Sequence, residues 1–145
     1  MLRTFPFNRI SMGIQTFQET TLKQLQRRHT ADQAIRAFQG CRTAGFQNIS
    51  IDLMYGLPGE TLTSWKKDLK QALSLHPEHI SAYHLIYEEG TPLWKLREQH
   101  KVEEADEDLS VSLFGTLIDE LTTAGYEHYE ICLLYTSDAA DDLTR

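Results

Sequence analysis

The segment NISIDLMYGLPGE, from Asn48 to Glu60, has the pattern of a buried strand that leads into a glycine- and proline-containing loop. Apolar side chains occupy the odd positions of the strand, while the even positions mix polar and bulky residues. This pattern suits a strand covered by helices on one face and by a barrel interior on the other. We expect the strand to end by presenting Asp52. Because ligands of parallel β/α proteins bind at the carboxyl ends of strands, Asp52 is either part of a site or a buried residue with a nearby partner.

The rest of the chain alternates between predicted strands and helices, the order typical of parallel β/α units. Besides the segment above, the pattern predicts strands at residues 9–15, 79–87 and 126–131. It predicts helices at residues 20–28, 30–44, 62–75, 91–99 and 108–124. Thr30 and Gln33 form a capping-box pattern at the start of the second helix, and Gly45 is placed to end it. In the last helix, the residues predicted to face the core are Phe114, Leu117, Ile118 and Leu121.

Three or four β/α units are too few to close an eight-stranded barrel. We therefore expect an α/β fold in which residues 1–131 form an arc of a barrel, or an open sheet with exposed edges. The last fourteen residues, CLLYTSDAADDLTR, show neither periodicity nor helix caps. We interpret residues 132–145 as a non-native tail, because they resemble a translated sequencing adapter. A natural, flexible acidic terminus is the alternative.

The composition excludes several classes of protein. A chain of 145 residues with 41% hydrophobic and 24% charged residues is long enough and apolar enough for one domain with a core. Its net charge of −7 argues against a nucleic-acid groove. No apolar run reaches the length of a membrane span, and the first residues lack the apolar core of a secretory signal. Two distant cysteines give no disulfide framework, so we expect a cytoplasmic protein.

Polar side chains gather at or just beyond the predicted strand ends. Gln15 follows the first strand, Arg27 lies in the segment after it, and Asp52 ends the second strand. An amide, a guanidinium and a carboxylate on one rim suit a small ligand with a carboxylate and hydroxyl groups. The alternative is structural, with Arg27 and Asp52 paired with each other or with the backbone. Spacing alone favours this alternative, because ion pairs that perturb carboxylates are common outside active sites.

Other chemistry has weaker support. Glu88 and Glu89 follow the third strand and, with Asp52, could form the two-carboxylate site of a β/α-barrel hydrolase. Adjacent acidic residues in a loop are usually only solvated, so this signal is weak. His79 and His84 have opposite strand parity and cannot bind one metal ion together, and no other spacing predicts a metal site.

Six collinear segments carry a resemblance to one known family: NRISMGIQTF, LKQLQRRH, AGFQNISIDLMYGLPGET, HISAYHL, EEGTPLWKL and AGYEHYEI. They are similar to the radical S-adenosylmethionine (SAM) family of oxygen-independent coproporphyrinogen III oxidases, and more closely to its haem-chaperone branch. The dipeptide Arg28-His29 favours that branch over the true oxidases. The resemblance covers residues 2–131.

The resemblance implies a function and a set of site residues. Gln15, Arg27 and Asp52 match residues that bind SAM, and Ile86 matches a position that contacts SAM through its backbone. The parent protein is expected to bind haem and deliver it to haem-accepting membrane proteins of respiration. Oxidative decarboxylation of coproporphyrinogen III, in porphyrin biosynthesis, is the first alternative.

The resemblance also identifies what this chain lacks. The cysteine triad that holds the family's 4Fe–4S cluster would lie upstream, and two distant cysteines cannot replace three thiolate ligands. We therefore expect the chain to be the second half of a radical SAM barrel and to be inactive by itself.

Overall fold

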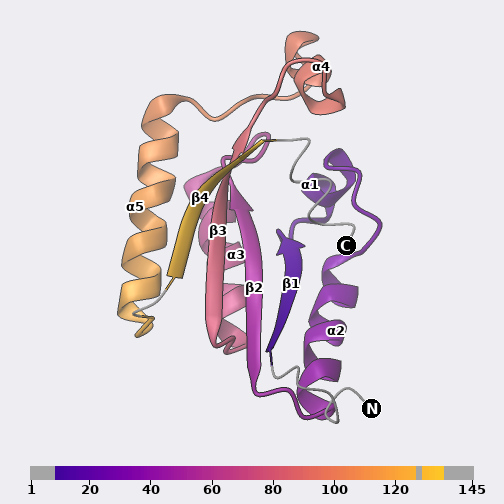
Figure 1. Ribbon diagram of the computed structural model, residues 1–145. Coiled ribbons are helices and arrows are strands. Elements are labelled where there is room, and N and C mark those ends of the chain that lie inside the picture. The colour runs from indigo at the N-terminus through magenta and orange to yellow at the C-terminus, as the bar shows by residue number, and fades with distance from the viewer. Residues whose placement is uncertain (1–8, 127–128, 136–145) are drawn as a thin grey trace.

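The computed structural model describes residues 9–126 and 129–135. Its four strands form one parallel sheet in the order β1-β2-β3-β4, which is also their order in the sequence. The strands are β1 (Arg9–Gln15), β2 (Asn48–Tyr55), β3 (His79–Ile86) and β4 (Tyr129–Tyr135). The helices are α1 (Glu19–Gln24), α2 (Ala31–Thr43), α3 (Leu62–Ser74), α4 (Pro92–Glu98) and α5 (Glu107–Thr123). Consecutive parallel strands joined through helices confirm the predicted α/β fold and its arc of β/α units (Figure 1).

The main core lies between the sheet and its three long helices. Figure 1 shows α3 behind the sheet, with α5 and α2 toward its two sides. The odd positions of β2 point into this layer and are fully buried, as the alternation of the sequence predicts. The core residues from the helices are Ala34, Phe38, Trp65, Leu69, Ala72, Leu113, Leu117 and Leu121. The even positions of β2 therefore face the opposite side, which is the barrel-interior side of the arc.

A second, smaller core covers the carboxyl end of that opposite side. It joins the last residues of β2 and β3 to α4 and to the loop after β2. Its buried members are Met54, Leu57, Leu85, Tyr87 and Leu93. Among the helices that the structure describes, none combines the length and apolar character needed to cross a bilayer.

Several element boundaries differ from the sequence-based expectation. The strand β2 continues three residues past Asp52, so this residue lies within the strand and not at its end. Apolar residues 53–55 extend the pairing because they are buried in the two cores. The helix α1 ends at Gln24, because Gln26 adopts a positive φ of 58° that a helix cannot continue through.

The last helix and strand differ as well. Leu117 and Leu121 of α5 are buried, as expected, but the third member of the buried row is Leu113, and Phe114 is 43% exposed. The strand β4 starts at Tyr129 and runs to Tyr135. It therefore includes the first four residues of the segment 132–145, whose foreign origin stays a prediction. Residues 136–145 lie outside the described part of the chain.

The helix caps follow the sequence closely. Thr30 and Gln33 form the predicted reciprocal capping box of α2, with Thr30 Oγ1 accepting from Gln33 N at 3.1 Å. Gly45 then takes a φ of 99°, the left-handed conformation expected after the helix end.

Candidate functional site

The carboxyl end of β1 contains an irregularity. Gly13 pairs with Asp52 and Gln15 pairs with Leu53, so the register shifts between the two positions. The amide of Thr16 donates to the carbonyl of Ile14 at 2.9 Å, and Gln15 between them has a φ of 74°. These features describe a γ-turn with positive φ at its centre, which is the rarer and strained form of that turn. Strain of this kind in a residue other than glycine is a recognised sign of a functional site.

The side chain of Gln15 is a buried polar group at the end of β1. Gln15 is 1% exposed, and neither its amide nitrogen nor its amide oxygen has a hydrogen-bond partner among the described residues. A buried polar group without a partner costs about 1–3 kcal/mol, so such groups are rare unless a ligand or water satisfies them. The strained backbone and the unsatisfied side-chain amide are independent observations, and both concern Gln15.

Asp68 of α3 holds the turn that follows Gln15. Its Oδ2 accepts from Thr16 Oγ1 at 2.5 Å, and its Oδ1 accepts from Phe17 N at 3.0 Å and from Gln18 Nε2 at 3.3 Å. Asp68 has no exposed surface. Burial raises the pKa of its carboxyl, because the charged form is poorly solvated, while the three hydrogen bonds act in the opposite direction.

Asp52 lies beside this turn on the interior side of the arc. It is half-buried, and its register partners are Gly13 on β1 and Ser81 on β3. Because Gln15 pairs with Leu53, Gln15 and Asp52 lie on neighbouring strands one register step apart. The structure thus brings these two predicted site residues together, although Asp52 lies deeper along its strand than expected.

Arg27 and Ile86 lie around the same edge of the sheet. Ile86 is the last residue of β3 and is half-buried. Arg27 is also half-buried, and burial lowers the pKa of its guanidinium. It lies in the connection from α1 to α2, which is fixed to β1 by a contact of 3.2 Å between His29 Nε2 and the Ile14 carbonyl. This contact anchors the chain two residues from Arg27 to the residue that precedes Gln15.

The loop after β2 contains a buried carboxyl that the sequence analysis missed. Glu60 is 7% exposed and accepts hydrogen bonds from Gly56 N at 2.8 Å and from Leu57 N at 3.3 Å. Burial raises the pKa of Glu60 to about 8, and the nearby Asp68 carboxyl adds to the rise, while the two backbone bonds oppose it. The Glu60 carboxyl therefore stabilises the loop to which it belongs, at the edge of the sheet where the candidate site lies.

Both missed acids leave a signal in the sequence. Asp68 falls between Trp65 and Leu69 on the apolar side of the α3 pattern, where an acid without a structural reason is unexpected. Glu60 follows the Gly-Leu-Pro-Gly turn, where a carboxylate can accept from the exposed backbone amides of that turn.

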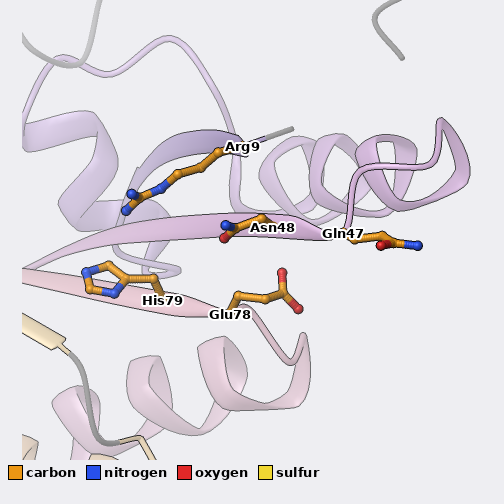
Figure 2. A pocket seen from close by; sticks show the side chains of 5 residues that line it. All are labelled: Arg9, Gln47, Asn48, Glu78 and His79. Carbon is orange, nitrogen blue, oxygen red and sulfur yellow. The ribbon is translucent and has the colours of Figure 1, made fainter. Parts of the chain in front are cut away.

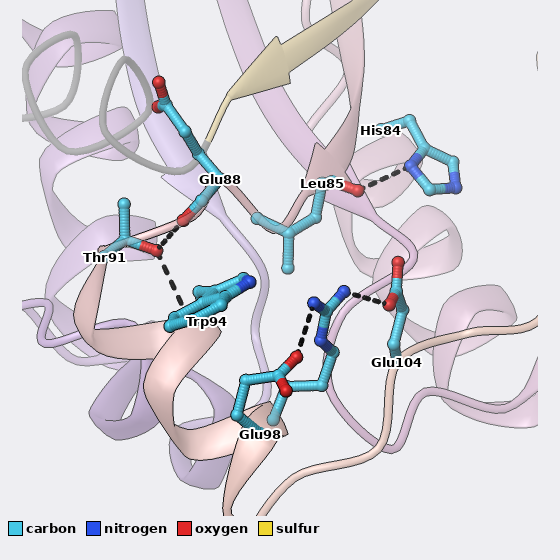
Figure 3. Close-up of polar contacts among 8 residues, drawn as sticks. His84, Leu85, Glu88, Thr91, Trp94, Glu98 and Glu104 are labelled. Carbon is cyan, nitrogen blue, oxygen red and sulfur yellow. Dashed lines mark hydrogen bonds and ion pairs between the residues drawn. The ribbon is translucent and has the colours of Figure 1, made fainter.

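The acidic residues after β3 do not form a pair with Asp52. Figure 3 shows the carbonyl of Glu88 accepting from Thr91 Oγ1 at 2.7 Å, and Thr91 in turn caps α4. Glu89 is exposed. Asp52 pairs with Ser81, which lies five residues before the end of β3, or roughly 17 Å along the strand. The two carboxylates of a glycosidase are only about 5–9.5 Å apart, so this geometry gives the hydrolase alternative no support.

The contacts of His84 are structural. His84 Nδ1 donates to the Leu85 carbonyl at 2.7 Å (Figure 3). His84 Nε2 lies 3.0 Å from Ser110 Oγ. The contact with Ser110 ties β3 to α5. Among the described residues, no three His, Cys, Asp or Glu side chains form a group that could hold a metal ion.

A cavity of about 530 Å³ lies at the other end of the strands (Figure 2). It is lined by Arg9, Gln47, Asn48, Glu78 and His79. Asn48 precedes Asp52 by four residues, or roughly 13 Å along β2, so the cavity is separate from the candidate site. Glu78 has a structural role there, because it contacts Arg42 at 2.7 Å and accepts from Ile49 N at 2.7 Å.

Comparisons with known proteins agree on one family. Residues 1–72 match the model of the radical SAM superfamily. The chain is 37% identical to the haem chaperone HemW of Lactococcus lactis over 124 residues, which cover 86% of this chain and 33% of that protein. It is 38% identical to HemW of Escherichia coli, with 85% of this chain and 32% of that protein covered. The chain thus spans about a third of the length of these curated relatives.

Solved structures give the same result for the fold. The coproporphyrinogen III oxidase HemN of Escherichia coli, described as a radical SAM enzyme, superposes with a TM-score of 0.70 at 28% identity. The match covers 87% of this chain and 29% of that one. The archaeal Elp3 of Methanocaldococcus infernus superposes with a TM-score of 0.72 over 90% of this chain and 30% of that one, and at 21% identity this likeness concerns the fold alone.

Proposed function

We propose that this chain, which belongs to the radical SAM superfamily, supplies one side of an S-adenosylmethionine site in a haem-chaperone-like protein. The residues that would hold SAM are Gln15, Arg27, Asp52 and Ile86. The observation that carries the proposal is the Gln15 amide, which is buried at the carboxyl edge of the sheet with both polar atoms unsatisfied by the described residues. A ligand with its own donors and acceptors would satisfy it.

The chemistry of these groups suits SAM. A guanidinium binds a carboxylate through two parallel hydrogen bonds, as Arg27 would for the methionine part of SAM. A carboxylate accepts from ribose-type hydroxyls, which is the role proposed for Asp52 on the interior side of β2. Gln15 offers one donor group and one acceptor, and Ile86 offers backbone groups at the end of β3. In this superfamily SAM supplies radical chemistry when it is cleaved at an iron–sulfur cluster.

The residues of this chain do not fit the cluster itself. A 4Fe–4S cluster is held by cysteine thiolates, and the family's motif uses three of them. The sequence has two cysteines, and Cys41 of α2 packs against the main core on the helical side of the sheet. The cluster ligands would therefore come from a part of the parent protein outside this chain.

The proposed cargo of the parent protein is haem. The chain is similar to several proteins named haem chaperone HemW, at 34–39% identity in the bacterial examples. The anchoring contact of His29 gives the Arg28-His29 dipeptide a defined place beside the Gln15 turn. We further propose that the parent protein delivers haem to membrane proteins of respiration. The similarity to HemN supports the alternative activity, oxidative decarboxylation of coproporphyrinogen III.

The test uses the full-length protein that contains this chain, with its cluster reconstituted under anaerobic conditions. SAM binding is measured by calorimetry, haem binding by Soret absorbance, and protoporphyrinogen formation by fluorescence after oxidation. We expect SAM and haem to bind, and Gln15→Ala to weaken SAM binding. Decarboxylation without haem binding would replace the chaperone assignment by the oxidase. Unchanged SAM binding in Gln15→Ala would refute the proposed site.

A further inference from the structure

Asp68 is a buried acid that contacts the backbone next to Gln15 from another layer of the fold. It belongs to α3, on the helical side of the sheet, and lies 52 positions along the chain from Thr16. Its two oxygens contact three consecutive residues, 16–18, which follow Gln15 directly. Thr16 Oγ1 also accepts from Gln18 N at 3.1 Å, which closes the turn on itself.

The complete burial of the Asp68 carboxyl costs free energy. Asp68 is completely buried, and its hydrogen-bond partners among the described residues include no cation. Removing a carboxylate from water is unfavourable unless a partner compensates, and well-packed apolar side chains are often as stable as a buried charge. A purely structural requirement could be met by an apolar residue in the α3 core. The role specific to the acid is to accept hydrogen bonds from residues 16–18.

That conformation is the strained turn at Gln15. A γ-turn with positive φ relaxes to an extended strand unless the surrounding structure fixes it. The hydroxyl of Thr16 and the amide of Phe17 are the groups that would rotate if the turn relaxed, and both donate to Asp68. Because the side chain of Gln15 follows its backbone, relaxing the turn would move the buried amide.

We propose that Asp68 is a positioning residue, which fixes the γ-turn so that the Gln15 amide is held in place for the ligand. The proposal rests on the SAM site proposed above and concerns the same edge of the sheet. Asp68 does not touch the ligand; it acts through Thr16 and Phe17. It therefore couples the helical layer to the affinity of the binding site.

The experiment is a double-mutant cycle in the full-length protein. SAM affinity is measured by calorimetry for the wild type, Asp68→Ala, Gln15→Ala and the double variant. We expect Asp68→Ala to weaken binding about tenfold, the scale of one lost hydrogen bond at a buried site. In the Gln15→Ala background the same substitution should change the affinity by less than about twofold, since residues that act through one another are not additive.

Conservative variants separate positioning from folding. Asp68→Asn keeps an oxygen for Phe17 N and is expected to restore affinity to within about threefold of the wild type. Thr16→Val removes the hydroxyl and should weaken SAM binding, whereas Thr16→Ser keeps it and should not. Ala72→Gly, one turn further along the same helix, destabilises α3 by about 1 kcal/mol and should leave the affinity unchanged. If Asp68→Ala does not fold, the Asn, Val and Ser variants carry the test.

The outcomes distinguish the two proposals. If Gln15→Ala binds SAM like the wild type, the site assignment fails and the role of Asp68 fails with it. If Gln15→Ala weakens binding but Asp68→Ala lowers only the melting temperature, the site stands and the positioning role is wrong. Equal losses from Asp68→Ala in both backgrounds would also refute positioning through Gln15.

Discussion

The ring of His84 lies against Gly56 so closely that a β-carbon on Gly56 would be 2.8 Å from His84 Cε1. Gly56 is the first residue after β2, and its φ of 72° is a conformation that other residues adopt at a cost. The same ring packs edge-on against Tyr55, with 5.0 Å between ring centroids, and is held by Ser110 of α5. The turn that leads out of β2 is therefore shaped by a side chain from the neighbouring strand.

Substitution of Gly56 by alanine should destabilise the protein through both effects. The positive φ costs about 1 kcal/mol, and the displaced ring would lose its bonds to Leu85 and Ser110, which brings the expected loss to about 2–4 kcal/mol. Gly59→Ala is the matched control, because Gly59 has a similar φ of 68° but open space around its Cα. Urea denaturation measures both variants. Equal losses in the two would show that the contact with His84 contributes nothing.

The raised pKa of Glu60 predicts that the stability of the protein depends on pH. Its pKa is about 8 in the folded protein against 4.5 as the ordinary value, so folding favours the protonated form. The stabilisation from this group is complete below pH 4.5 and is lost as the pH rises through 8, by at most about 1.4 kcal/mol per pH unit. In Glu60→Gln, the free energy of unfolding should fall less steeply between pH 5 and 8. Asp68 has a raised pKa too, so part of the slope should remain. Parallel curves for the two proteins would contradict the prediction.

Gln15 should show opposite effects on stability and on binding. Glycine adopts a positive φ freely, and Gln15→Gly also removes the unsatisfied buried amide, so the two gains offset the lost packing. We expect the free energy of unfolding to stay equal or rise, while SAM affinity falls about tenfold or more. His76→Gly relieves a φ of 55° at the end of α3 and should stabilise without any effect on SAM. A Gln15→Gly variant that is less stable by more than about 2 kcal/mol would mean that the amide has a structural partner.

Substitution of Asp52 should weaken SAM binding and leave the cluster intact. In the full-length protein, Asp52→Ala is expected to weaken SAM binding while the visible absorbance of the iron–sulfur cluster is retained. The reason is that Asp52 lies on β2 of this chain, whereas the cluster ligands would lie outside it. Calorimetry and absorbance on one preparation provide the measurement. If the absorbance is lost together with SAM binding, Asp52 has a structural role.

The sequence predicts the elements of this fold well because their signals are local. The alternation of β2 and the capping box at Thr30 depend on neighbours within four residues, and both are confirmed. The end of β2 was misplaced because Met54 and Tyr55 are buried by residues from distant segments, which extends the pairing past Asp52. Phe114 was assigned to the core of α5 because a helical pattern gives the width of the apolar stripe but not its rotation.

The candidate site was only partly predictable for the same physical reason. Gln15 and Asp52 are visible in the sequence as polar groups near strand ends, and the structure places them on neighbouring strands. The strained turn at Gln15 was not, because no glycine or asparagine marks it and its geometry depends on Asp68, 51 positions from Phe17. The pKa of Glu60 likewise depends on burial under the surrounding segments, which a linear pattern does not contain.

The strand β1 has a partner on only one side within the described sheet. Its neighbours along the sheet are all parallel, and parallel crossovers in proteins are almost always right-handed. A further strand that continues the parallel pattern at this side would therefore have its connecting helix on the side of α2 and α3. The outer edge of β1 in the described sheet thus has a direction, and parallel extension of the sheet there has a fixed handedness.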